Sequence, residues 1–344
     1  GRGPLGRGAA GMTTPDDLRP ADLRPADLPR AAPAALPFQN PLKGITLKLG
    51  SVTVFTVMGA ILKATADEVP VGEQVFFRSF FAIPVILVWL ASRGELGTGL
   101  RTHRPMSHFY RGIIGTMAMV CGFAGLGLLP LPEQTALGYA MPLLTVLFAG
   151  MFLGEEIRGF RISMVLLGIV GVLIVLSPRL GSGGADVSTR ETLGAVVTLA
   201  GAALGALAQI FIRRMVTQER TSAIVFWFSV TSTVLALVSL PFGWVWPAPA
   251  TAALLVATGT LGGIGQIMLT SSYRYADASL VAPFDYASMV LALLIGWFVF
   301  GEVATTTMLA GAAVIIAAGI AIIWRERQLG IARSRSRKAM TPQG

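Results

Sequence analysis

The chain has 344 residues, of which 53% are hydrophobic and only 13% are charged, and its formal net charge is +9. Soluble domains carry about 25% charged residues, so this composition excludes an ordinary water-soluble domain and predicts an integral membrane protein. The positive charge does not indicate nucleic-acid binding, because most lysines and arginines lie in short loops and tails, where they orient membrane proteins.

Residues 1–40 are predicted to form a disordered cytoplasmic tail. They contain the Pro-rich repeat DLRPADLRPADLPR, which has balanced charge and no apolar periodicity. The tail lacks the apolar core of a cleavable signal peptide, so the first transmembrane helix is expected to target the chain. Because the sequence starts at Gly1, we expect Met12 to be the initiator and the preceding residues to be an extension.

Ten apolar segments of helical length follow, and each is long enough for a hydrocarbon layer of about 30 Å. Their approximate ranges are 44–64, 73–92, 108–129, 131–153, 160–177, 192–214, 221–240, 250–273, 278–300 and 305–324. Prolines interrupt several segments, which membrane helices tolerate because neighbouring helices satisfy the freed backbone groups. Arginines concentrate in the loops that are internal if the N-terminus is cytoplasmic, and the external loops then contain only Arg179 and Arg190.

One sequence pattern occurs in both halves of the chain. The segments LPEQTALGYAMPLLTVLFAGMFLGE (131–155) and ASLVAPFDYASMVLALLIGWFVFGE (278–302) align with Tyr139 on Tyr286 and with Gly-Glu at both ends. A shorter match pairs VFFRS at 75–79 with VFWFS at 225–229. The chain is therefore predicted to contain two copies of one membrane unit.

The two copies are predicted to lie upside down relative to each other. The loop EEIRGFR after the first copy of the pattern is basic, whereas the corresponding loop EVATTT has no lysine or arginine. Opposite charge bias in equivalent loops is what an inverted repeat requires. The prediction is an all-α protein with five-helix repeats at 42–178 and 190–325, cytoplasmic termini and a basic cytoplasmic tail at 326–344.

This arrangement resembles the EamA-type permeases of the drug/metabolite transporter superfamily. The resemblance rests on the ten segments, the inverted halves, the two Gly-Glu helix ends, and the stretches VFFRSFFAIP and RPMSHFYRG, and it covers about residues 42–325. Within the family the chain is most similar to bacterial permeases for S-adenosylmethionine and riboflavin. The resemblance implies a multi-pass protein of the bacterial inner membrane with ten transmembrane helices. It also implies a central cavity contacted by spans 1, 3, 4, 6, 8 and 9.

Tyr139 and Tyr286 are the first candidates for substrate binding. Transporters built from repeats place their site near the midplane, where the halves meet. Each tyrosine is about 12 Å deep at helical rise, and the two enter from opposite sides, so they are predicted to straddle the midplane. A tyrosine offers a flat ring for stacking and a hydroxyl for orientation. The alternative is that each is an interfacial or packing residue.

Charged residues within the spans supply further candidates. Asp285 is an acid within an apolar span, where burial is costly and usually functional, so it could bind a substrate cation or carry a proton. The alternative is that Asp285 lies in water near the cytoplasmic end of its span, where Arg274 neutralises it. Arg78 could contact a substrate anion, pair structurally with a carboxylate or extend to the interface, and the structural pair is favoured. The span-end acid Glu302 is predicted to cap a helix or pair across a loop.

Gln209 and Gln266 complete the set, because their amides could hydrogen-bond to the edge of a heterocycle. Contacts between helices are the alternative role for these amides. By contrast, Lys48, Lys63 and Arg111 lie near span ends and are predicted to extend to the membrane interface.

A secondary transporter is the favoured function, with alternating access around a central site. Riboflavin is the first substrate considered, and S-adenosylmethionine or an aromatic amino acid is the alternative. The partners expected are a small molecule and the lipid bilayer, without nucleic acid, cofactor, metal or catalytic residues, and a homodimer is left open. A membrane enzyme acting on lipid-linked substrates is less favoured, because such enzymes cluster His, Asp or Glu residues.

Overall fold

The computed structural model describes residues 40–153, 159–181, 189–215, 218–276 and 278–340. Within these ranges all regular elements are helices, which confirms the predicted all-α class. The expected N-terminal tail, the Met12 start and the first Gly-Glu end lie outside the described residues.

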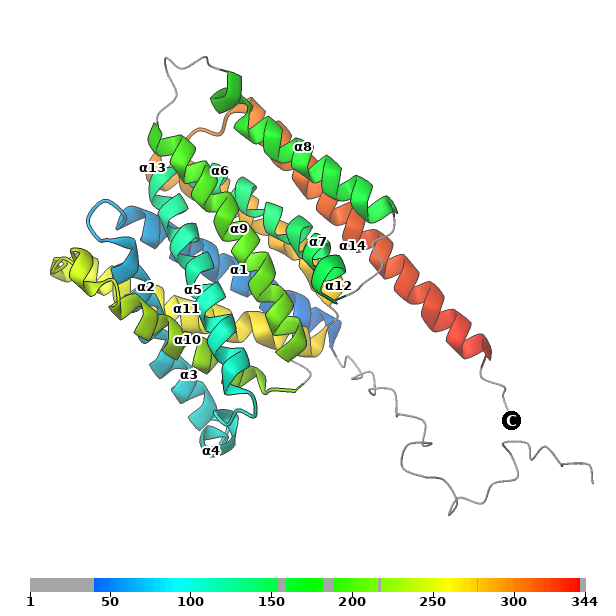
Figure 1. The fold of residues 1–344 in the computed structure, drawn as a ribbon, viewed down its shortest axis with the longest axis horizontal. Coiled ribbons are helices and arrows are strands. Elements are labelled where there is room, and N and C mark those ends of the chain that lie inside the picture. The colour runs from blue at the N-terminus through cyan, green and yellow to red at the C-terminus, as the bar shows by residue number, and fades with distance from the viewer. Residues whose placement is uncertain (1–39, 154–158, 182–188, 216–217, 277, 341–344) are drawn as a thin grey trace, which may run out of the picture. The chain divides into compact units, whose positions relative to one another are not determined.

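The first half of the described chain contains eight helices (Figure 1). They are α1 (Pro41–Ala64), α2 (Val71–Phe80), α3 (Ala82–Ala91), α4 (Leu96–Gly99), α5 (Pro105–Leu128), α6 (Leu131–Gly138), α7 (Ala140–Leu153) and α8 (Gly159–Gly181). The second half contains α9 (Thr189–Met215), α10 (Thr221–Leu237), η2 (Leu240–Phe242), α11 (Pro249–Tyr275), α12 (Ala278–Val281), η3 (Ala282–Tyr286), α13 (Ala287–Phe300) and α14 (Thr306–Met340), where η2 and η3 are 3₁₀ helices.

Nine helical segments among the described residues are long and apolar enough to cross a bilayer. A further apolar helix, α10, has 17 residues. These segments coincide with the apolar stretches predicted from the sequence, and the second to last of them runs through η3 and α13. The chain is therefore a multi-pass membrane protein.

Prolines explain where three of the long segments are broken. Pro84 and Pro142 each occupy the third position of a helix, α3 and α7. Proline has no N–H group, so the carbonyl four residues earlier loses its helical partner. Those carbonyls belong to Phe80 and Gly138, where α2 and α6 end. In the second half, Pro283 lies in η3, where the chain narrows to a 3₁₀ turn before α13.

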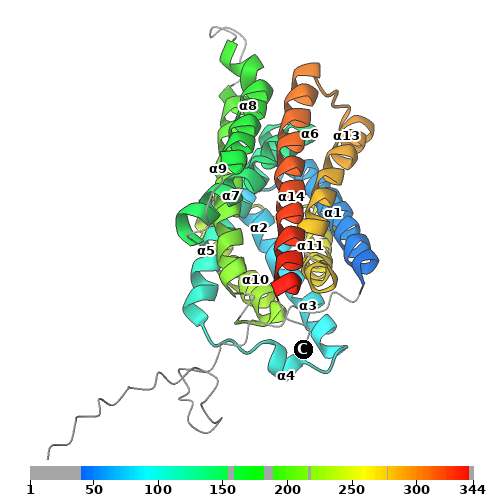
Figure 2. The same ribbon diagram turned by 90° about the vertical axis from the view of Figure 1, so that its right-hand side faces the viewer.

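The helices pack in a pattern that is preserved when the two halves are exchanged. The exchange maps α1 to α9, α2 to α10, α5 to α11, the α6–α7 segment to α12–α13, and α8 to α14. The packing of α1 on α11 then maps onto the packing of α9 on α5, and the α2–α10 and α8–α14 contacts map onto themselves. Figures 1 and 2 show α8 and α14 running alongside each other. This is the pairing that two related five-helix units produce.

The contacts of single glycines show the same correspondence between the two halves. Gly115 of α5 and Gly262 of α11 are separated by the same offset as Tyr139 and Tyr286. A Cβ on Gly115 would lie 2.9 Å from the ring of Phe228, and one on Gly262 would lie 3.1 Å from Nε of Arg78. Arg78 and Phe228 are themselves equivalent positions in the matched VFFRS and VFWFS stretches. One turn earlier, the equivalent glycines face the equivalent residues Thr231 and Phe81.

Candidate substrate-binding site

The structure brings Tyr139 and Tyr286 into contact at the two helix breaks. Tyr139 follows α6, and Tyr286 ends η3. Their ring centroids are 5.0 Å apart with the rings nearly perpendicular, and both residues are buried. The Tyr139 hydroxyl lies 2.6 Å from Oγ of Ser288, which itself donates to the carbonyl oxygen of Asp285 at 2.7 Å, so the tyrosine is the donor. In this conformation the two rings pack against each other.

Asp285 forms an ion pair with a lysine that the sequence analysis placed at the interface. Its Oδ1 lies 2.7 Å from Nζ of Lys48, whose side chain is only 2% exposed, whereas the Asp285 side chain is 44% exposed. The prediction that Lys48 extends to the interface is therefore wrong. The signal lay in the spacing of α1, because Lys48 shares a helix face with the buried residues Gly44, Ser51 and Val52. The alternative partner, Arg274, has a side chain outside the described part of the structure.

A second ion pair joins the opposite end of α1 to the end of α13. Nζ of Lys63 lies 2.9 Å from Oε1 of Glu302 and donates to the carbonyl oxygen of Leu129 at 2.6 Å. Oε2 of Glu302 accepts from the N–H of Leu131, the first residue of α6, at 2.8 Å. The acid therefore caps a helix and pairs across a loop, as predicted, whereas Lys63 turns to a protein partner and not to the interface.

Arg78 and Arg111 are both buried on the ring of Phe228 in α10. Their guanidinium carbons lie 5.6 and 4.0 Å from the ring centroid. Among the described residues, neither guanidinium has a carboxylate at ion-pair distance, so the favoured structural pairing of Arg78 with an acid is wrong. Arg111 was predicted to reach the interface, and its buried position was missed. Its spacing from His108 and Gly115 on the buried face of α5 is the signal that could have found it.

Gln209 in α9 and Gln266 in α11 are half-buried. In the part of the chain that the structure describes, neither amide has a hydrogen-bond partner from the protein. Gln266 lies one helical turn beyond Gly262, on the helix face that meets Arg78. The substrate-binding role of the two amides stays a prediction.

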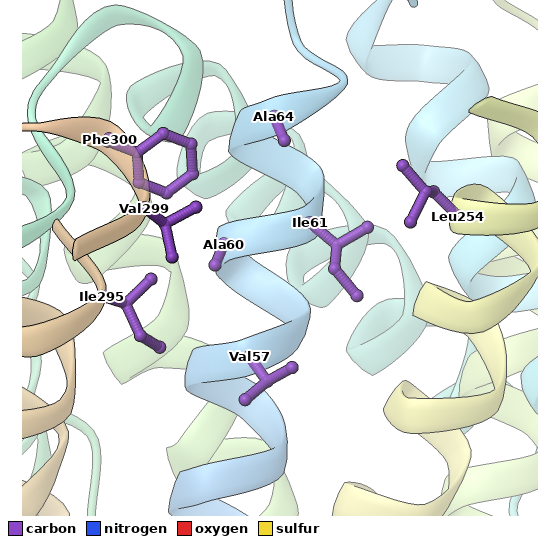
Figure 3. Close-up of a pocket in the computed structure, with 8 residues that line it drawn as sticks. All are labelled: Val57, Ala60, Ile61, Ala64, Leu254, Ile295, Val299 and Phe300. Carbon is purple, nitrogen blue, oxygen red and sulfur yellow. The ribbon is translucent and has the colours of Figure 1, made fainter. Parts of the chain in front are cut away.

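Two pockets lie away from these residues. A groove of 340 Å³ between α1, α11 and α13 is lined only by apolar side chains, including Val57, Leu254 and Val299 (Figure 3). It offers no polar group to a metabolite. A pocket of 540 Å³ at the start of α2 and α11 contains Glu73 and the aromatic residue Trp244. Neither pocket contains a sequence-predicted site residue.

Comparisons with known proteins agree with this architecture. The EamA-like transporter family model matches residues 42–177 and again 192–325. A pseudopaline exporter of Pseudomonas aeruginosa (strain UCBPP-PA14) is 31% identical over 81% of this chain and 95% of that protein. An S-adenosylmethionine uptake transporter of Rickettsia prowazekii (strain Madrid E) is 28% identical over 83% of this chain and 94% of that protein. A riboflavin transporter of Rhizobium johnstonii is 30% identical over 75% of this chain and 82% of that protein.

A solved crystal structure also resembles the chain. It has 21% sequence identity and a TM-score of 0.60, and the match covers 83% of this chain and 98% of that one. At this identity the likeness shows the fold alone. The family match extends over both halves, and the relatives are bacterial transporters. The chain therefore belongs to the EamA-like transporter family and is a multi-pass transporter of the bacterial inner membrane.

Proposed function

We propose that this chain is a non-enzymatic secondary transporter that moves a small organic metabolite by alternating access. The observation that carries the proposal is the double attachment of α1 to the η3–α13 segment. One ion pair, Lys48–Asp285, lies near the start of α1, and the other, Lys63–Glu302, lies near its end. The two lysines are about 22 Å apart at helical rise. A site between the halves opens to one side when one pair breaks and to the other side when the second breaks.

The broken helices supply the proposed binding site. Discontinuous helices near the midplane are where transporters built from repeats expose polar groups to a substrate. Here the breaks place Tyr139 and Tyr286 together, with Asp285 in the same 3₁₀ turn. The substrate would separate the two rings and stack on them, while Gln209 and Gln266 would hydrogen-bond to its polar edge.

The substrate class proposed is a metabolite that combines a planar ring with polar groups. Riboflavin is the first compound to test, and S-adenosylmethionine and the aromatic amino acids are the alternatives. The relatives support a search across these compounds, since two of them are named for riboflavin and S-adenosylmethionine transport. The five-helix units proposed for the rocking motion are residues 42–178 and 190–325.

Transport in reconstituted vesicles tests this function directly. The full chain is expected to exchange at least one radiolabelled compound from a panel of riboflavin, S-adenosylmethionine and aromatic amino acids. Asp285→Asn is expected to remove the pH dependence of that exchange, because the variant lacks the carboxyl group that would carry the proton. Absence of exchange for the whole panel would reject the substrate class, and an unchanged pH profile would reject the proton role of Asp285.

A further inference from the structure

Two buried arginines meet on one aromatic ring in the interior of the helical bundle. Arg78 of α2 is 5% exposed, and Arg111 of α5 is 6% exposed. Both guanidinium groups lie over Phe228 of α10. Arg78 and Phe228 occupy equivalent positions in the two halves. Their contact therefore joins matching positions of the two units. The arginines therefore lie where the two halves meet.

The hydrogen-bonding capacity of this pair is unused in the described structure. Nε of Arg78, and Nε and Nη1 of Arg111, are buried and have no hydrogen-bond partner among the described residues. Two buried acids of neighbouring elements, Glu73 of α2 and Glu219 in the turn before α10, have other partners. Glu73 accepts from the N–H of Val245, and Glu219 accepts from the N–H groups that precede α5. A cation–π contact compensates a buried charge only in part, and an unmatched guanidinium in a membrane protein is costly.

The surrounding backbone makes room for the two guanidinium groups. Nη1 of Arg111 occupies the space that a Cβ of Gly115 would take, and Nε of Arg78 lies against Gly262. Gly115 is one turn further along α5 than Arg111, on the side away from the predicted cytoplasmic end. The Arg111 side chain therefore extends deeper into the bundle, which is the opposite of reaching for the interface.

We propose that Arg78 and Arg111 together bind one compact anionic group, the carboxylate of the transported substrate. Guanidinium groups bind carboxylates through paired N–H donors in a planar fork, and the free N–H groups here come from both arginines. A carboxylate between them would supply the missing negative charge and the missing acceptors together. This proposal rests on the proposed transport function and names a property of its substrate.

The site separates the candidate substrates by their chemistry. S-adenosylmethionine and the aromatic amino acids carry a carboxylate, whereas riboflavin does not. An anion site at this position thus favours the first two classes over riboflavin.

Anion-dependent stability of the purified full chain tests the site without requiring transport. Thermal unfolding in detergent is measured while acetate or chloride replaces methanesulfonate, an anion without a carboxylate, at constant ionic strength. Acetate is expected to raise the unfolding temperature of the wild type more than chloride does, because a ligand that binds only the folded state stabilises it. Arg78→Gln and Arg111→Gln are each expected to weaken the apparent acetate affinity about tenfold or more.

Arg93→Gln is the matched control, since Arg93 also lies over an aromatic ring, that of Trp89, but is exposed to solvent. It is expected to keep the acetate response. No acetate response in the wild type, a response to chloride alone, or an equal response in the two glutamine variants would overturn the proposal. If a variant fails to fold, the acetate titration of the wild type still tests the proposal. This assay measures anion binding and not transport. A negative result would therefore overturn the anion site but not the transport function, which the vesicle assay tests separately.

Discussion

At the scale of single residues, the ion pair of Lys48 and Asp285 decides how α1 meets the broken segment before α13. Lys48 is almost fully buried, so its charge is favourable only with a nearby carboxylate. We expect Lys48→Gln and Asp285→Asn each to lower the free energy of unfolding. The double variant should lose less than the sum of the single losses, with a coupling of about 0.5–3 kcal/mol. Unfolding of the four proteins in detergent measures this coupling.

The pair of Arg190 and Asp67 provides the comparison for that cycle. Its N–O distance of 2.9 Å is similar, but its side chains are 59% and 85% exposed. Exposed pairs are screened by water and contribute little, so Arg190→Gln with Asp67→Asn should be additive. A coupling between Lys48 and Asp285 no larger than the coupling of this exposed pair would contradict the role assigned to Lys48.

At the scale of elements, Glu219 fixes the start of α5 from a distance. Its Oε1 accepts from the N–H groups of His103 and Arg104 at 2.8 and 2.9 Å and from the hydroxyl of Thr102 at 3.0 Å. Burial alone would raise the pKa of Glu219, but these hydrogen bonds and the nearby His108 hold the pKa of the carboxyl below its usual value. A remote carboxylate thus serves as the cap that α5 lacks from its own N-cap side chain.

Glu219→Gln should therefore destabilise the protein by about 1–2 kcal/mol at neutral pH. A lowered carboxyl pKa stabilises the fold above the ordinary glutamate pKa of about 4.3, and this contribution is lost as the pH falls through the folded-state value. The difference between wild type and variant should hence shrink below about pH 4.3. Unfolding across pH measures it, with Glu95→Gln, which has no capping bond, as the control. A difference that does not change with pH would contradict the assignment.

Close contact between α8 and α14 depends on two facing glycines. A Cβ on Gly171 would lie 2.9 Å from the carbonyl oxygen of Gly311, and a Cβ on Gly311 would lie 2.7 Å from that of Gly171. Backbone atoms cannot move aside as a side chain can, so Gly171→Ala should cost about 1–3 kcal/mol of stability. Gly122→Ala is the matched control, because its Cβ would meet nothing within 4 Å. Equal stability of the two variants in detergent unfolding would refute this packing argument.

At the scale of the whole molecule, the charge bias of the loops predicts the orientation of each span. Thr306, at the start of α14, is predicted to face the outside, although the equivalent loop of the first half is predicted to face the cytoplasm. A single cysteine at Thr306 in a Cys121→Ala background should react with a membrane-impermeant maleimide added to intact cells. A cysteine at Ser92 should react only after the membrane is opened. The reverse labelling pattern would exclude the predicted orientation of the chain in the membrane.

Much of the fold could be read from local sequence. The apolar segments and the proline breaks follow from composition and from backbone chemistry, and both act over a few residues. The matched stretches around Tyr139 and Tyr286 likewise predicted a meeting of equivalent positions, and the two rings are in contact. Helical spacing also contained the signal for Lys48 and Arg111. Their closeness to the span ends instead suggested the membrane interface, so the positions of both side chains were predicted wrongly.

The sequence by itself determined the class of protein, the positions of most helices and the presence of one unit in two copies. These features depend on hydrophobicity and periodicity, which are properties of neighbouring residues. The tertiary structure alone decided the partners of the buried charges, because Lys48 and Asp285, or Arg111 and Phe228, are far apart in the chain. In a low-dielectric interior, charge must be matched by whatever the packing brings within a few ångströms. Packing across the two halves leaves Arg78 and Arg111 together on one ring with N–H groups unused.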